Sequence, residues 1–324
     1  MNRFSPIRRV ALALLLALFS LPAFAQLDAI EDFLAAGEAN ITELTRAYLA
    51  PLPTGLSTAL NSGWTTKAAP TKTLGFSLQF RVAASAVPSG DQTFDARELN
   101  LTGITVSGVE SNTLLGDSDA GQTLTVDGTG ASFSIPEGTG VPIVPLPIIQ
   151  GNVGLIKKTD LTLRYTPETD LGDYGDVSVF GAAIKHDVNQ YLPAGKLLPV
   201  DISVMAAFTQ VNMNANLSGD GQRVETTTNA FVFNALVGKT LPFLSAYGGL
   251  GFQTGNFQVD MVGQYDLGAG QSITDPVSYD DNSDAVVHAL AGAQFKLGFF
   301  RIFLEGTASN YFTINGGIGL GFRN

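Results

Sequence analysis

The sequence lacks cysteine and is poor in histidine, tryptophan and charged residues. It contains no Cys, two His and one Trp among 324 residues. A chain without Cys forms no disulfide framework and performs no thiol chemistry. Charged residues make up only 15% of the chain, against about 25% in ordinary soluble domains. The composition therefore excludes thiol enzymes and predicts a surface that is unusually short of charge.

Long apolar runs are also missing after residue 25, although the chain is hydrophobic. Apolar residues make up 45% of it and the mean hydropathy is +0.19. A transmembrane helix needs about 20 consecutive apolar residues, and no later segment supplies them. The apolar residues lie instead in short alternating segments. A sheet can enter lipid only if it closes on itself so that every backbone group is paired, which is the organisation that this pattern indicates.

The first 25 residues have the three parts of a secretory signal peptide. Residues 1–9 include three Arg and no acid, residues 10–21 are apolar apart from Ser20, and residues 23–25 read Ala-Phe-Ala. The alternative is a membrane anchor, but the apolar stretch is shorter than a bilayer span. We expect cleavage before Gln26.

Basic residues are scarce in the rest of the chain. Without residues 1–25 and their three Arg, 15 of the 18 Lys and Arg remain against all 29 Asp and Glu. Such an excess of acid argues against nucleic acid as a partner. It leaves a membrane possible, because barrels present neutral surface to lipid and keep charge on loops.

The final segment shows the alternation most clearly. Its residues Phe312, Ile314, Ile318, Leu320 and Phe322 fall on one face, with polar residues and Gly on the other. Side chains of a strand alternate between two faces, so this segment has one apolar face. That face would be buried in a soluble periplasmic β-protein and would meet lipid in an outer-membrane barrel. We predict the second, an all-β transmembrane antiparallel β-barrel of about 10–12 strands (range 10–14).

The barrel is expected to occupy residues 71–324. Predicted strands are 73–82, 94–106, 152–166, 175–187, 200–213, 224–238, 243–259, 285–297, 299–309 and 311–323. An Asp-Gly turn inside 123–135 predicts a hairpin that could raise the count from ten to twelve. Residues 108–150 form an irregular Pro- and Gly-rich insertion, and four prolines within 136–150 predict an extended loop there. Short and long connections alternate, which is typical of barrels with periplasmic turns and outer loops.

Residues 26–70 are predicted to be helical, because apolar residues recur at helical spacing from Leu27 to Tyr48. Gly37 interrupts the pattern, Pro51 ends it, and a second short helix is expected near residues 55–62. We expect this segment to plug the lumen or lie at the periplasmic mouth, and a cap over one barrel end is an equally good interpretation.

Charged and polar residues inside the strands fall on the face opposite the apolar one. A charge on the lipid face costs roughly 2–4 kcal/mol at the midplane, so these residues are predicted to face the lumen. They either form an ion-pair network that fills a small barrel or line a water-filled passage, and the network is favoured because barrels of this size leave limited room. The candidates are Arg81, Asp160, Arg164, Asp201, His288, Lys296, Arg301 and Glu305.

No motif for catalysis, metal or nucleotide binding stands out. Neither His186 nor His288 is paired with a candidate nucleophile, as hydrolysis would require. The glycines of residues 248–255 lie in a predicted strand without a following helix and do not match a dinucleotide fingerprint. Residues 117–121 begin like a calcium loop but lack its later ligands. We therefore expect no enzyme, no cofactor and no metal, and rank a hydrolase using either His last.

Several stretches resemble a family of uncharacterised outer-membrane barrel proteins from Gram-negative bacteria. They are Lys-Thr-Leu-Gly-Phe at 72–76, Thr-Asp-Leu-Thr-Leu-Arg-Tyr at 159–165, and Lys-His-Asp at 185–187 followed by Leu-Leu-Pro-Val-Asp at 197–201. The resemblance spans most of the mature chain and implies a fold and a location, without an activity. Helices before a barrel are also similar to the architecture of long-chain fatty-acid transporters, by analogy alone.

These observations predict an outer-membrane protein of a Gram-negative bacterium, surrounded by lipid. The C-terminal strand is expected to engage the outer-membrane assembly machinery, although Phe322 stands third from the end. The leading hypothesis is a passive channel or transporter for a small solute, with hydrophobic solutes among the candidates. The alternative is a closed structural or surface-interaction barrel that acts through its acidic loops at 214–223 and 260–284.

Overall fold

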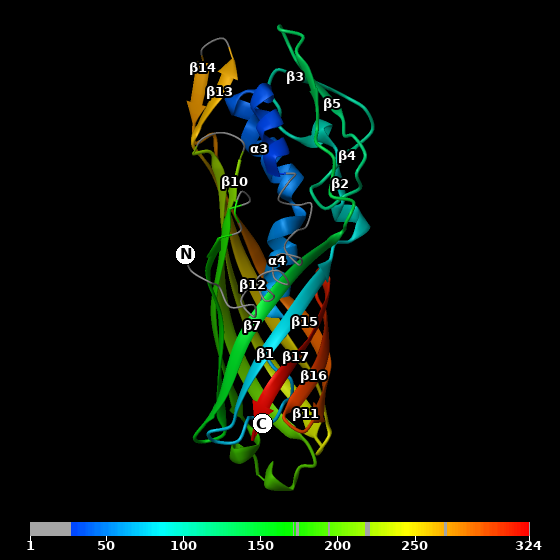
Figure 1. Ribbon diagram of the computed structural model, residues 1–324. Helices are drawn as coiled ribbons and strands as arrows, with labels where there is room; N and C mark the ends of the chain where they lie inside the picture. The colour runs from blue at the N-terminus through cyan, green and yellow to red at the C-terminus, as the bar shows by residue number, and fades with distance from the viewer. Residues whose placement is uncertain are drawn as a thin grey trace, which may run out of the picture.

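The protein is a closed antiparallel barrel of ten strands, seen in a computed structural model that describes residues 27–170, 172, 175–193, 195–217, 221–268 and 271–323 (Figure 1). The predicted signal peptide lies outside the described residues. Around the wall the strand order is β1-β17-β16-β15-β12-β11-β10-β9-β8-β7. This confirms the predicted fold class and the lower end of the predicted strand count. The wall strands are β1 (Phe76–Ala86), β7 (Ile143–Leu155), β8 (Thr159–Asp170), β9 (Asp176–Asp187), β10 (Asp201–Asn216), β11 (Arg223–Thr240), β12 (Leu244–Val262), β15 (Val277–Leu297), β16 (Phe300–Ala308) and β17 (Phe312–Phe322).

The outer face of the wall is apolar. In β17, Phe312, Ile314, Ile318, Leu320 and Phe322 are all about half exposed, as the alternation predicts. Large apolar side chains on the neighbouring strands are exposed in the same way. A soluble monomer rarely shows a continuous apolar surface of this kind, whereas a membrane barrel requires one. The architecture is therefore that of an outer-membrane barrel.

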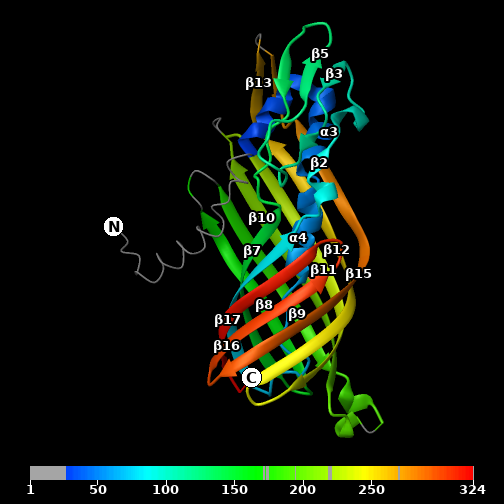
Figure 2. The same ribbon diagram turned by 90° about the vertical axis from the view of Figure 1, so that its right-hand side faces the viewer.

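The two ends of the barrel differ. The C-terminal end carries the chain terminus and the short turns at 156–158, 241–243 and 298–299, together with a longer connection at 188–200 that contains η5 (Asn189–Tyr191) and η6 (Gly195–Leu197). At the opposite end, here called the loop end, β10 to β15 rise above the other strands (Figure 2). The segment predicted as an acidic loop, 260–284, is largely strand: the ends of β12 and β15 and the hairpin of β13 (Gln264–Gly268) and β14 (Gln271–Thr274).

Residues 87–142 form an insertion at the loop end, outside the wall. The predicted strand 94–106 is wrong, because this stretch belongs to the insertion and takes no part in the barrel. The 123–135 hairpin does form, with Gly128 at φ 87° in its turn, but it adds no wall strand. The insertion holds η2 (Ser89–Asp91), β2 (Thr93–Phe94), η3 (Ala96–Glu98), β3 (Ile104–Ser107), β4 (Ser111–Asn112), β5 (Thr123–Val126) and β6 (Ser132–Ser134).

The wall strand that the sequence did not predict is β7, which contains two of the prolines that predicted a loop at 136–150. β7 pairs with β1 over residues 143–153, but with β8 only over residues 150–155. Pro145 and Pro147 have no N–H, so they fit a strand only where the nitrogen points away from the paired neighbour. The facing stretch of β8 contains Pro167. Along these described residues the wall therefore has an unpaired β7–β8 seam (143–149 and 165–170). The predicted strand 152–166 is likewise two strands, divided by the turn at 156–158.

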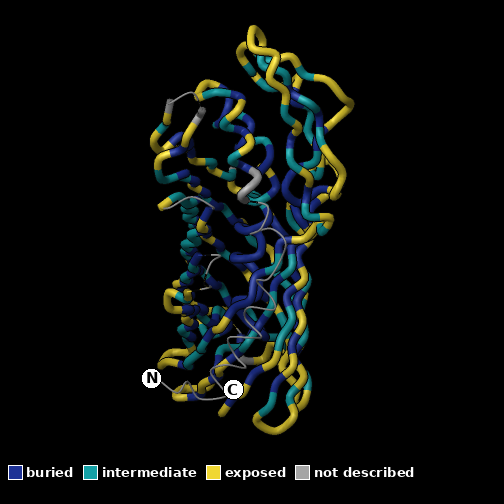
Figure 3. Tube along the Cα trace, turned by 45° about the horizontal axis from the view of Figure 1, so that its top comes forward, coloured by how far each residue is buried: buried dark blue, intermediate teal, exposed yellow. Residues whose placement is uncertain are grey.

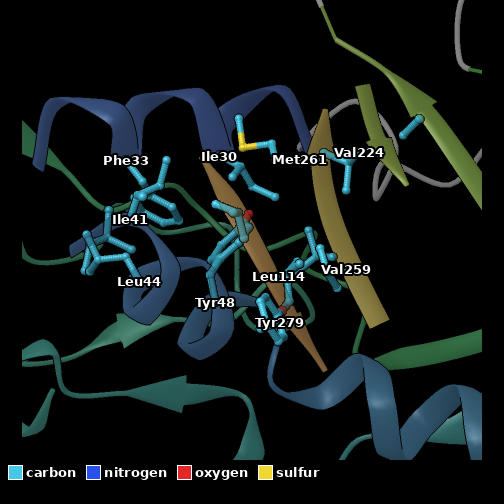
Figure 4. Packing of buried hydrophobic residues seen from close by; sticks show 14 of the residues in the cluster. Ile30, Phe33, Ile41, Leu44, Tyr48, Leu114, Val224, Val259, Met261 and Tyr279 are labelled. Carbon is cyan, nitrogen blue, oxygen red and sulfur yellow. The ribbon is translucent and has the colours of Figure 1, made fainter. Parts of the chain in front are cut away.

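The N-terminal helices start at the loop end. They are η1 (Leu27–Ala36), α3 (Glu38–Leu49) and α4 (Pro51–Asn61), with the break at Gly37 that the sequence predicts. The ends of β10, β11, β12 and β15 that rise at the loop end are here called the tall strands. Ile30, Phe33 and Tyr48 pack with them and with Leu114 of the insertion (Figure 4). This cluster is the largest apolar core of the described chain. Among the described residues no helix is long and apolar enough to span a bilayer.

α4 lies inside the barrel. It contacts β1, β7, β10, β11, β12, β15 and β17 around the wall, and in Figure 3 the buried tube runs down the middle. Gly55 permits this close approach, because a Cβ there would lie 2.5 Å from Cγ2 of Val144 in β7. α4 lies where the predicted alternative of a lumen plug would place it. η1 and α3 lie at the loop end, opposite the short turns, where the alternative of a cap over one barrel end would place them.

Candidate functional site

The candidate site is the contact between the barrel wall and residues 51–71, here called the plug. After α4 the plug continues without regular structure from residue 62 toward the C-terminal end, where Leu74 N–H donates to Gly154 O at 2.9 Å. β1 then starts upward. Residues 62–71 read Ser-Gly-Trp-Thr-Thr-Lys-Ala-Ala-Pro-Thr, which has neither helical nor strand periodicity. Their backbone groups therefore need partners from outside the segment.

Arg164 of β8 binds the end of α4. Its guanidinium donates to Leu60 O and Ser62 O, both at 2.6 Å, and to Gln150 Oε1 at 2.9 Å. The last carbonyls of a helix lack intrahelical partners and carry partial negative charge, so a cation is favoured there. The same guanidinium lies 3.6 Å from the ring centroid of Trp64. Arg164 is fully buried and is held on three sides.

A second cluster joins Arg81 of β1 and Glu305 of β16 to the plug. Glu305 Oε1 accepts from Gly63 N at 2.6 Å, and its Oε2 lies 2.6 Å from the Tyr247 hydroxyl. Arg81 donates to Thr65 O at 3.2 Å and lies over the ring of Phe303. The two charges thus bind the backbone of residues 63–65 from the two strands that flank β17.

The third cluster is a buried ion pair. Lys185 Nζ of β9 lies 3.1 Å from Asp160 Oδ2 of β8, and both side chains are almost fully buried. Asp160 also accepts from Thr71 N at 2.7 Å, while Lys185 donates to Thr65 Oγ1 at 2.8 Å and Lys67 O at 3.0 Å. A buried pair is stable only when further hydrogen bonds satisfy both ions, and here the plug supplies them.

Little space remains between plug and wall. A cavity of about 10 Å³, lined by residues such as Trp64, Lys67 and Asp160, lies beside the ion pair. That is about the least volume that can hold one water molecule. Beside the ion pair the plug therefore packs closely against the described wall.

The remaining candidates from the sequence lie elsewhere on the inner face. His288 Nε2 is 2.7 Å from Asn234 Oδ1 and the residue is buried, away from the three clusters. Asp201, Lys296 and Arg301 stand near the C-terminal end. Lys296 donates to Leu241 O at 3.2 Å and Arg301 to Phe300 O at 3.0 Å. The structure thus brings Arg81, Asp160, Arg164 and Glu305 onto the plug, and leaves the other four candidates off it.

Sequence reasoning missed Lys185 and Gln150, and it placed Tyr247 and Asn315 on the inner face without assigning them partners. Lys185 falls on the same face of its strand as the inward Val177 and Val179, so strict alternation along β9 would have found it. Gln150 was hidden because its strand was assigned to a loop. Tyr247 and Asn315 act by binding Glu305 and Arg81, which no periodicity reveals.

The chemistry of this site is that of holding a segment in place. Among the described residues, no group of three or more His, Cys, Asp or Glu could hold a metal ion. His186, at the C-terminal end, lies 2.8 Å from Thr159 Oγ1 and 2.9 Å from the Tyr191 hydroxyl. His186 thus joins β8, β9 and η5 at this end of the barrel.

Comparison with known proteins gives a family. Residues 5–322 match the model of a "Family of unknown function (DUF6588)". The chain belongs to this family. No curated protein matches it.

Several solved outer-membrane barrels are similar to it. The attachment invasion locus protein Ail of Yersinia pestis is 12% identical over 77% of this chain and 97% of its own, with a TM-score of 0.28. The translocator domain of autotransporter NalP from Neisseria meningitidis is 11% identical over 88% and 100%, with a TM-score of 0.34. The outer membrane protease OmpT of Escherichia coli is 8% identical over 78% and 98%, with a TM-score of 0.34. These superpositions are loose, so the fold assignment rests on the topology of the barrel itself.

Proposed function

We propose that this protein is a gated outer-membrane channel for a small solute, and that the plug is its gate. The observation that carries the proposal is the polar character of the surface between plug and wall. Arg81, Asp160, Arg164, Lys185 and Glu305 all face the plug and are buried against it. An apolar interface would hold a permanent filler at least as well, because replacing buried ion pairs by apolar residues is often neutral or stabilising. A charged wall has the further property that water can solvate it once the plug withdraws.

The solute proposed is small, and hydrophobic solutes are among the candidates. Toward the loop end the polar clusters give way to an apolar stretch formed by Leu146, Ile148, Val179 and Val211 of the wall around Leu60 of α4. A solute moving along the lumen would therefore meet an apolar section and then a charged one. This order of apolar and charged sections along the lumen favours a molecule that carries both apolar and polar groups.

The orientation proposed places the C-terminal end in the periplasm. Outer-membrane barrels have short periplasmic turns and longer outer loops, and the insertion and tall strands lie at the opposite end. η1, α3 and the insertion would then face the cell exterior of a Gram-negative bacterium, after removal of residues 1–25 as a signal peptide. β17, the last strand, would be presented to the assembly machinery.

Single-channel conductance in planar bilayers tests this function. The full-length mature protein should show rare, brief openings, and a variant lacking residues 27–70 should show a steady conductance. Folding of both proteins is checked by heat-modifiable mobility in gels. Folded proteins that conduct in neither form would reject the channel.

The same experiment serves a second candidate, a closed surface-interaction barrel. The loop end favours it, since η1, α3 and the insertion share a core that resembles a small soluble domain set on the barrel. Arg46 of α3 also pairs with Asp281 of β15 at 3.4 Å and stacks on Tyr279, which fixes the helix to the tall strands. If no form conducts, this candidate takes precedence.

A further inference from the structure

The structure contains a second cavity, separate from the lumen, where plug, insertion and wall meet. Its volume is about 270 Å³, slightly below the roughly 300–1,000 Å³ of sites for drug-sized ligands. It is lined by Ala47, Ala50, Thr54, Gly90, Asp91, Thr93, Phe94, Thr113 and Tyr311. Gly90, Asp91 and Thr93 are exposed, so the cavity opens to solvent at the loop end.

The lining has one charge and it is negative. Burial, and next the carboxylate of Asp91, raise the pKa of the Tyr311 hydroxyl at the turn before β17. Tyr311 is only 2% exposed, so this carboxylate lies beside the buried side of the cavity. None of these lining residues is Lys, Arg or His, and the carboxylate therefore keeps acceptor capacity for a ligand.

The remaining groups suit an organic cation. Phe94 offers an aromatic ring, whose face attracts cations. Thr54 and Thr93 add hydroxyls, while Ala47 and Ala50 supply apolar contact. A carboxylate and a ring on one small cavity are the groups that recognise an ammonium attached to an apolar body.

From these features the geometry points to a binding site for a small organic ammonium compound, with Asp91 as its charge partner. The site lies outside the lumen, so it requires no conduction and extends beyond the proposed channel. Thr54 belongs to the first turn of α4, so a bound ligand would bridge the plug to the insertion. Binding should accordingly stabilise the folded protein by mass action.

The test compares three probes of nearly equal shape: benzylammonium, benzyl alcohol and benzoate. Each is titrated by ligand-detected NMR against the full-length mature protein in lipid nanodiscs, with empty nanodiscs subtracted. Benzylammonium should bind with a dissociation constant on the order of 1 mM, the scale for a ligand of about eight heavy atoms. Benzyl alcohol should bind at least about tenfold more weakly, since it lacks the charge-assisted contact, and benzoate should show no saturable binding.

Two variants locate the site. Asp91→Asn should weaken benzylammonium binding about tenfold or more, while Asp119→Asn, an exposed acid of the same insertion, should leave it unchanged. Ala50→Leu should reduce binding by filling the cavity without changing charge. Equal binding of the three probes, unchanged binding in both Asp91→Asn and Ala50→Leu, or no saturable benzylammonium binding would each overturn the proposal. If Asp91→Asn fails to fold, the probe series and Ala50→Leu decide.

Discussion

At the scale of single residues, the plug depends on a few buried charges whose partners are backbone atoms. Arg164 and Lys185 together contact carbonyl oxygens of residues 60, 62, 67 and 69. Hydrogen bonds to charged groups contribute about 1.5–3 kcal/mol each. Because these bonds end on backbone atoms, substitutions in the plug leave the acceptors in place, and only changes in the wall remove the donors.

Arg164→Met should release the end of the plug. The change removes two hydrogen bonds to carbonyls and the contact with the ring of Trp64, so we expect a loss of about 3 kcal/mol in plug binding. Trp64 is the only tryptophan, and its fluorescence should become more accessible to aqueous iodide. Arg223→Met, which breaks an exposed pair with Glu225, is the matched control. Equal iodide quenching in the two variants would contradict the role assigned to Arg164.

Asp95 should make the stability of the insertion depend on pH. Hydrogen bonding from Arg97 holds the pKa of Asp95 well below its ordinary value of 3.8. A depressed pKa in the folded state means that the contribution to stability is present above pH 4 and is lost as the pH falls further. Hydrogen exchange of residues 93–126 should therefore be faster in Asp95→Asn than in wild type at pH 5, and this excess should shrink progressively as the pH is lowered from 4 to 2. An excess that stays constant from pH 5 to pH 2 would disprove the linkage, and Asp119→Asn is the control.

At the scale of elements, the sequence predicted the strands well where both neighbours pair regularly. From β9 to β17 each predicted strand matches a wall strand, apart from the ends of β12 and β15 and the β13–β14 hairpin in 260–284. Alternation in these wall strands reflects lipid on one side and the lumen on the other. β7 was missed for two reasons. Its apolar residues Val144, Leu146 and Ile148 face α4. Its prolines argue against a strand that is paired on both edges, but they are compatible with one whose second edge is unpaired. Whether a strand is paired on one edge or on both depends on the assembled sheet, so the local sequence pattern could not reveal the unpaired edge of β7.

The β7–β8 seam should close when its prolines are replaced. Pro145→Val together with Pro147→Val restores two N–H donors on the free edge of β7, each able to contribute about 1 kcal/mol if paired. We expect slower hydrogen exchange in residues 165–170 of β8. Pro142→Val, just outside the strand, should not change it. Unaltered exchange in the double variant would show that the prolines do not set the seam.

At the scale of the whole molecule, the chain passes through its own barrel. Its described part starts at the loop end with η1, descends inside as the plug, turns at the C-terminal end and then builds the wall. The sequence predicted a helical segment before the barrel, but not which end it occupies. That depends on how Ile30, Phe33 and Tyr48 fit the tall strands and the insertion, contacts between residues far apart in the chain. The four plug-binding charges were predictable as inward, whereas their backbone partners were not.

Labelling of intact cells should place the first helices outside. A Cys introduced for exposed Glu38 in α3 should react with a membrane-impermeant maleimide, and the natural chain provides no competing thiol. A Cys introduced for Lys239, which is exposed at the C-terminal end, should react only after permeabilisation. The reverse pattern would show that the proposed orientation is wrong.

Gating of the lumen by the plug can be measured with a reversible covalent lock between the two. In the double variant Gly55→Cys and Val144→Cys, the two Cβ atoms would lie 3.2 Å apart, close to the roughly 3.5–4.5 Å found in disulfides. The measurement is single-channel conductance of this variant before and after addition of a reductant, with Gly55→Cys alone as control. If the plug is the gate, the channel should show no openings while the disulfide is intact and should open after reduction. Equal conductance in the oxidised and reduced states would contradict it.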